Sequence, residues 1–333
     1  MAADAPAPRS RIPGRALTWA GLLISAVFTY FAVRNAHFTD VWDALRSSNY
    51  WWLLPAFLAL AVGLFFKAVR WRCVFSSETR PPMRPLAKAL LVGYFVNTIL
   101  PARAGEAARV VVLNRNSGTS LAEAGTTVVV ERVYDVLSLL FLLFVAVPWL
   151  PGVTWLHAAA LLALVLVVVL ALVVAVLAVY GLRPVRFALR LLSRLPFLTA
   201  ETVDHVAASL GRGLVGLRHP RVMAAGLLWS TAAWLAIAAS TWFVMKGFHL
   251  GLSLVAALLV VIATNLVQIL PSPPSALGVF EAATVVALGA YGVADSDALS
   301  YALVLHALST VVFIVVGLLL LRETLSLRRS SSS

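Results

Sequence analysis

The pattern of apolar residues along the chain predicts long helices rather than strands. Uninterrupted apolar stretches alternate with short clusters of arginine. A helix needs about 20 apolar residues to cross the hydrocarbon core of a bilayer. The apolar residues run continuously instead of alternating, which excludes transmembrane strands. We therefore predict membrane helices at residues 16–33, 51–69, 127–147, 156–180, 221–245 and 299–321.

Two further apolar segments are interrupted. Residues 89–100 carry no charge but stop at a polar stretch, residues 101–106, which we call the first interruption. A stretch of this length is typical of a re-entrant or interfacial segment. Residues 251–270 are long enough to span a bilayer, but they run into a proline-rich stretch, residues 271–275, which we call the second interruption. Its three prolines must break the helix, and a further apolar run follows.

Composition places the chain among integral membrane proteins. Hydrophobic residues make up 61% of it, charged residues only 12%, and the mean hydropathy is +0.94. Soluble domains carry about 25% charged residues. We therefore predict an all-α integral membrane fold: a polytopic helix bundle with about six full spans and two inverted re-entrant helical hairpins, located in the cell membrane.

Basic residues predict the orientation. The 26 basic residues outnumber the 14 acidic ones and gather at the ends of the apolar stretches, where they orient helices and contact anionic membrane lipids. We therefore expect no nucleic-acid partner. The N-terminus, the segment after the second helix, residues 183–221 and the C-terminus hold 18 of them, whereas the intervening loops hold Arg34, Arg46 and Lys246. This asymmetry predicts that both termini are cytoplasmic.

We expect a single membrane domain, residues 16–325, between a cytoplasmic tail at residues 1–15 and a disordered tail at residues 326–333. Within it, residues 183–219 are too polar to span. They either lie on the anionic leaflet as an amphipathic helix or form a solvated loop. Both termini can be cytoplasmic only if each interrupted segment crosses an even number of times, as a re-entrant hairpin or as two short spans.

The sequence suggests no cofactor or metal. Cys73 is the single cysteine, which excludes a disulfide framework and a cysteine-based metal cluster. None of the three lysines follows a glycine, so the chain lacks the G-K-[ST] phosphate loop of nucleotide-driven transporters. Any transport across the membrane would therefore have to be downhill, or coupled to protons through a carboxylate or His306.

The stretches around the two interruptions resemble each other. Each stretch contains an asparagine, an Ile-Leu-Pro run, a glycine and a glutamate in that order, from Asn97 to Glu106 and from Asn265 to Glu281. By the charge count, the first enters the membrane from the cytoplasm and the second from outside. Interrupted segments in corresponding places of two inverted halves point to a substrate site near the membrane midplane.

The charged residues at the first interruption are candidates for substrate binding. Arg103 and Arg109 could bind a phosphate, because a guanidinium matches phosphate in a bidentate manner. Glu106 and its counterpart Glu281 would balance the arginines or bind a cationic headgroup. Charged residues inside a membrane are costly and mark a site or pathway.

Candidates also lie on two later helices. Glu131, Arg132 and Asp135 sit near the start of one, where they either contact a ligand or hold the hairpin by neutralising one another. His306 lies inside the last predicted helix. It either bonds a neighbour, binds a headgroup or carries a proton.

Several of these residues form motifs that resemble a known family, the transmembrane flippase region of lysylphosphatidylglycerol synthases. The resemblance covers nearly the whole chain. It is carried by Arg70-Trp71-Arg72, by Leu-Pro-Ala-Arg-Ala-Gly-Glu-Ala-Ala-Arg at 100–109, by Glu-Arg-Val-Tyr-Asp at 131–135 and by Gly-Val-Phe-Glu at 278–281.

The resemblance implies a lipid-translocating domain in which two re-entrant hairpins enclose a headgroup groove. The aminoacyltransferase domain of the bifunctional members is absent from this sequence, so we do not expect lysyl transfer. Two departures affect headgroup specificity: Pro-Ser-Pro-Pro-Ser replaces a glycine-rich turn, and His306 stands where an arginine is expected.

Three functions remain open on the sequence. The leading one is a flippase that moves a phospholipid or a lipid-linked envelope precursor. The first alternative is a membrane-embedded transferase acting on lipid phosphates, although we find no nucleotide, metal or nucleophile motif. The second is a non-catalytic scaffold for a separate enzyme of envelope biosynthesis, docked through the basic segment 183–221.

Overall fold

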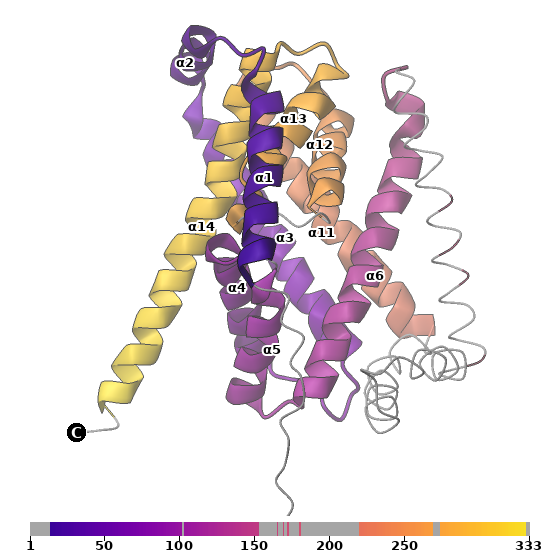
Figure 1. Ribbon diagram of the computed structural model, residues 1–333. Coiled ribbons are helices and arrows are strands. Elements are labelled where there is room, and N and C mark those ends of the chain that lie inside the picture. Colours follow the sequence, from indigo (N-terminus) through magenta and orange to yellow (C-terminus); the bar gives the residue numbers. More distant parts are fainter. Residues whose placement is uncertain are drawn as a thin grey trace, which may run out of the picture.

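The structure is a computed structural model that describes residues 14–101, 103–152, 220–268 and 274–330, together with the single residues 165, 169, 172 and 180. Every regular element in these residues is a helix, so the all-α prediction is confirmed (Figure 1). The segment 183–219 and most of the predicted helix 156–180 lie outside the described residues.

The first part of the chain forms α1 (Gly14–Val33), α2 (Phe38–Ser47), the 3-10 turn Tyr50–Trp52 and α3 (Leu53–Val74). We did not predict α2, a short amphipathic helix whose Val41 packs into the core. Helix α3 runs five residues beyond the predicted end at residue 69. It therefore includes Arg70, which is buried in the bundle and does not belong to the basic residues that orient the chain.

The first interruption connects two packed helices, α4 (Met83–Ile99) and α5 (Ala104–Ser117). Their contact requires two glycines. A β-carbon on Gly105 would collide with the Gly93 carbonyl oxygen, so only glycine lets the two backbones approach this closely. The two helices form a packed helical hairpin that extends beyond the apolar stretch 89–100 on both sides, and its re-entrant placement in the membrane stays a prediction.

Helix α6 (Leu121–Ala146) follows the hairpin, and α11 (Pro220–Gly247) packs along α3 more extensively than any other described pair does. The second interruption separates α12 (Leu254–Val267) from α13 (Val279–Gly289). Among the described helices, three segments are long and apolar enough to cross a membrane: Tyr50–Val74, Arg221–Gly247 and Asp295–Leu320. The count of six full spans stays a prediction.

The last helix is α14 (Asp295–Ser330), which extends past the predicted end at residue 321. The disordered tail at residues 326–333 stays a prediction. The stretch after residue 321 is rich in leucine, arginine and glutamate, which favour helix, and it holds neither glycine nor proline.

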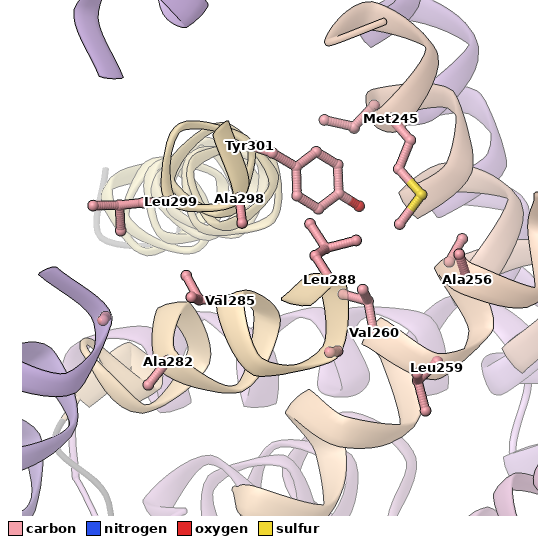
Figure 2. Close-up of a cluster of buried hydrophobic side chains, with 14 of the residues drawn as sticks. Met245, Ala256, Leu259, Val260, Ala282, Val285, Leu288, Ala298, Leu299 and Tyr301 are labelled. Carbon is pink, nitrogen blue, oxygen red and sulfur yellow. The ribbon is translucent and has the colours of Figure 1, made fainter. Parts of the chain in front are cut away.

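The largest buried cluster holds α11, α12, α13 and α14 together (Figure 2). Tyr301 of α14 is fully buried in it, close to Met245 and Leu288. Its hydroxyl donates to the Thr241 carbonyl oxygen at 3.0 Å, so the polar end of this ring is satisfied inside an apolar core. The α12–α13 pair is thus fixed by packing on both sides of the second interruption.

The two interrupted pairs occupy opposite ends of the bundle. In Figure 1, α4 and α5 lie in the lower half, on the side of the C-terminus, whereas α12 and α13 lie in the upper half. The helix starts that follow the interruptions therefore face each other across the middle of the molecule.

Candidate functional site

Both interruptions border one cavity of about 280 Å³. Residues of α3, α6, α11 and α14 also line the cavity. A direct hydrogen bond joins the two interrupted segments, because Arg103 Nη2 donates to the Gln268 carbonyl oxygen at 2.8 Å. The polar and charged side chains that line it are Lys67, Tyr94, Asn97, Thr98, Arg103, Glu106, Arg132, Asn265, Gln268, Ser275, His306, Ser309 and Thr310.

The first interruption is held by a local hydrogen bond. Asn97 Oδ1, near the end of α4, accepts from the backbone N–H of Gly105 at 2.7 Å. This bond satisfies a donor in the first turn of α5, where helical backbone donors lack a partner. Asn97 is therefore a positioning residue that also lines the cavity.

Arg103 has an unusual backbone conformation. It lies at the start of α5 with φ 55° and ψ 34°, in the left-handed region that non-glycine residues rarely occupy. Such strain persists where the surroundings impose it, and it concentrates at functional sites. The turn places the Arg103 side chain at the cavity, where 43% of it is exposed.

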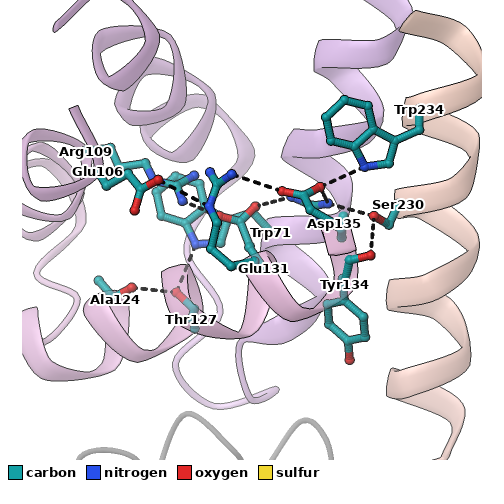
Figure 3. Close-up of polar contacts among 12 residues, drawn as sticks. Trp71, Glu106, Arg109, Ala124, Thr127, Glu131, Tyr134, Asp135, Ser230 and Trp234 are labelled. Atoms are coloured by element: carbon teal, nitrogen blue, oxygen red, sulfur yellow. Dashed lines mark hydrogen bonds and ion pairs between the residues drawn. The ribbon is translucent and has the colours of Figure 1, made fainter. Parts of the chain in front are cut away.

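A buried ionic network stands behind the cavity, between α3 and α6. The Arg70 guanidinium lies 2.8 Å from Glu131 Oε1 and 2.5 Å from Asp135 Oδ1. Asp135 Oδ1 also accepts from the indole N–H of Trp234 at 3.0 Å (Figure 3). Because all three ionic groups are buried, removing one of them leaves the others uncompensated.

Arg109 belongs to this network and does not reach the cavity. Its Nη2 lies 2.6 Å from Glu131 Oε2, its guanidinium stacks on the ring of Trp71 at 4.7 Å, and only 5% of its side chain is exposed. The structure therefore gives Arg109 a role in joining α5 to α6. The carboxylates of Glu131 and Asp135 likewise form ion pairs with arginine. Of the two alternatives that the sequence left open, this arrangement favours the one in which these residues hold the hairpin rather than contact a ligand.

Glu106 and Arg132 are the members of the ionic network that face the cavity together with Arg103. Arg132 Nε lies 3.3 Å from Glu106 Oε1, and Arg103 Nη1 lies 3.8 Å from the same oxygen. Arg132 also lies 3.4 Å from Asp135 Oδ2. One carboxylate thus serves two arginines whose side chains are more than 40% exposed, which leaves positive charge for a ligand.

The second interruption carries a hydrogen-bonded chain instead of arginines. Glu281 Oε2 accepts from the backbone N–H of Gly278 at 2.7 Å and so caps α13. Its Oε1 lies 2.6 Å from His306 Nδ1 on α14, and His306 Nε2 lies 3.1 Å from Ser275 Oγ. We had considered that Glu281 balances the arginines of the first interruption. Its partners are instead Gly278 and His306. Asn265 lines the cavity, and its amide donates to the Val261 carbonyl oxygen of its own helix.

Sequence analysis missed Lys67 and Ser275. Lys67 lies two residues before the end of the predicted helix 51–69, and an ionisable residue within an apolar span is a signal for function that could have identified it. Ser275 carries no such signal, because its place beside His306 depends on how α14 packs against α13.

Comparison with protein families shows the family of this chain. Residues 18–317 match the family described as the lysylphosphatidylglycerol synthase TM region. The chain belongs to this family. The resemblance predicted from its motifs is therefore confirmed, and the family relates the protein to phospholipid handling in a membrane. A comparison with curated proteins found no match.

Proposed function

We propose that this protein is a lipid translocator that moves a phospholipid or a lipid-linked precursor across the cell membrane. The observation that carries the proposal is the meeting of both interruptions at one polar cavity. An apolar slab tolerates broken helices and charged side chains where they face protein, water or a polar ligand. A headgroup would use this cavity while the acyl chains stay in lipid.

Helix dipoles add to the attraction for a headgroup. The α5 start bears Arg103 and Glu106, the α13 start bears Phe280, and all three residues line the cavity. The N-terminus of a helix carries a partial positive charge, which attracts phosphate. With the termini in the cytoplasm, one helix start would meet the headgroup from each side of the membrane.

The test is lipid translocation in proteoliposomes. Fluorescent phospholipid in the inner leaflet becomes accessible to an external quencher only if the protein moves it. Arg103→Gln removes a cavity cation and the bond to Gln268, and we expect translocation to fall about tenfold, as for the loss of one charge-assisted hydrogen bond. Arg115→Gln is the matched control, because this arginine also lies on α5 but is exposed outside the cavity.

An enzymatic second candidate has its own observation. In the chain Ser275–His306–Glu281, the carboxylate accepts from Nδ1–H, which leaves Nε2 free to accept the Ser275 hydroxyl proton. A serine, a histidine and a carboxylate in this order can activate a hydroxyl for acyl transfer. Ser275 also has φ 58°, in the left-handed region.

The acyl-transfer candidate is tested with a fluorophosphonate probe on the full chain in detergent. Covalent labelling that disappears in Ser275→Ala, and not in the control Ser309→Ala, would favour it. Absence of labelling would reject it. A protein that neither labels nor translocates lipid would be left as a scaffold for another enzyme.

A further inference from the structure

Lys67 is a buried cation without a matching anion. Only 8% of this residue is exposed, and it lines the cavity from α3. Among the described residues, no carboxylate lies within ion-pair distance of its ammonium group, which instead lies 3.9 Å from the ring centroid of Trp234 and 6.0 Å from that of Tyr94. Asp135, the buried carboxylate on the neighbouring helix α6, is already engaged by Arg70, Arg132 and Trp234.

A buried ammonium is costly unless it is paired. Cation–π contacts offset part of that cost, because the faces of aromatic rings attract cations. They do not replace the three hydrogen bonds that an ammonium group can donate. The position of Lys67 at the cavity wall therefore calls for an anionic ligand.

The charges around the cavity indicate the charge of the ligand that would neutralise them. Behind the wall, Arg70 and Arg109 are neutralised by Glu131 and Asp135. At the wall, three cations face a single carboxylate, so two positive charges remain: the cations are Lys67, Arg103 and Arg132, and the carboxylate is Glu106.

The Glu281–His306 pair does not alter the sign of this balance. Glu281 is nine-tenths buried, its two oxygens are taken by Gly278 and His306, and it does not line the cavity. The pair is neutral when His306 is protonated and adds one negative charge when it is not. The cavity stays positive in both cases.

We propose that Lys67 binds the phosphate of a lipid whose headgroup carries two negative charges, a phosphate monoester or a diphosphate. This inference rests on the proposed function and narrows its substrate. A phosphate monoester carries about −1.5 to −2 at pH 7 and presents three acceptor oxygens. A diester such as phosphatidylglycerol carries one negative charge. Zwitterionic and cationic headgroups also carry only one negative phosphate charge, and their amine adds positive charge to an already cationic cavity.

The geometry assigns separate tasks to the cations. Lysine acts on phosphate as a point charge, whereas arginine binds two oxygens in a plane. Lys67 comes from α3, Arg132 from α6 and Arg103 from the first interruption, so the three approach the cavity from different walls. A terminal phosphate, with three oxygens, can meet several walls at once.

The experiment measures binding to the full chain in detergent with short-chain fluorescent lipids: phosphatidic acid as monoester, phosphatidylglycerol as diester and phosphatidylcholine as zwitterion. We expect phosphatidic acid to bind at least about tenfold more tightly than phosphatidylglycerol, and phosphatidylcholine to bind weakest. Lys67→Met should abolish the preference for the monoester.

Lys246→Met is the matched control. Lys246 also packs on a tryptophan, with its ammonium 4.9 Å from the ring of Trp242, but it does not line the cavity. Its substitution should leave all three affinities unchanged. Lys67→Arg keeps the charge, so it should retain at least part of the monoester preference and shows that Lys67→Met acts through charge rather than misfolding.

Equal affinities for the three lipids, or an unchanged preference in Lys67→Met, would overturn the inference. Inorganic phosphate that displaces the probe as well as phosphatidic acid does would show that the site takes the free ion, and would overturn the lipid assignment. Monoester-selective binding without translocation in liposomes would leave this inference standing and sink the proposed function. Translocation without headgroup preference would support the proposed function and overturn this inference.

Discussion

The two interruptions begin from similar sequences but build different environments. Each has an asparagine near the end of its first helix and a glutamate in the first turn of its second helix. Each also holds a non-glycine residue in the left-handed region, Arg103 in one and Ser275 in the other. The backbone plan is therefore shared.

The side chains differ in what they contact. Asn97 bonds across the first interruption to Gly105, whereas Asn265 bonds back to its own helix. Glu106 pairs with two arginines at the cavity, whereas Glu281 caps its own helix and meets His306. The comparison teaches that the first interruption supplies positive charge to the cavity, whereas the second supplies a chain of hydrogen-bonding groups without an arginine or lysine.

The largest effect is expected where the first interruption depends on the ionic network. Arg70→Leu removes the cation shared by Glu131 and Asp135 inside the bundle. Because breaking a buried pair leaves an uncompensated charge, we expect the free energy of unfolding to fall by about 3 to 5 kcal/mol. Unfolding by sodium dodecyl sulfate in mixed micelles measures it, with exposed Arg115→Leu as control. Equal stability of the two variants would contradict a structural role for Arg70.

An intermediate effect is expected at the backbone contact of the first hairpin. Gly105→Ala places a methyl group against the Gly93 carbonyl oxygen and forces α4 and α5 apart. Overpacking of this kind costs about 1 to 3 kcal/mol. Gly125→Ala on α6 is the control, because nothing lies within 4 Å of the added carbon. It should be neutral or stabilising, and the same unfolding assay compares the two. A neutral Gly105→Ala would mean that the hairpin is looser than described.

The smallest effect is expected at the second interruption. Glu281→Ala removes the cap of α13 and the partner of His306, which costs about 1 to 2 kcal/mol. Asp297→Ala is the control, since it removes an acidic residue from the first turn of α14 for which no hydrogen bond or ion pair is found among the described residues. If Glu281→Ala lowered the free energy of unfolding as much as Arg70→Leu does, the second interruption would depend on charge as strongly as the first. That result would contradict the difference between the two interruptions.

Much of the fold could be predicted from sequence, because the signals are local. Apolar length identified α1, α3, α11 and α14, and proline and glycine marked both interruptions. A hairpin or a pair of short spans was predicted at the first interruption, but the extent of α5 was not, since α5 is too polar to be recognised as a membrane element. Helix α2 was missed for the same reason.

The sequence by itself determined that this is a helical membrane protein with two interrupted segments, and it identified which residues bring charge to them. The tertiary structure alone decided the partner of each charge. Arg70 forms ion pairs with carboxylates more than 60 positions away in the chain and does not line the cavity. Arg109 is likewise paired with Glu131 away from the cavity, whereas Lys67 lines the cavity wall. Helix formation follows from neighbours in the chain, but ion pairing inside a membrane depends on which helices pack together, because only contact can repay the burial of a charge.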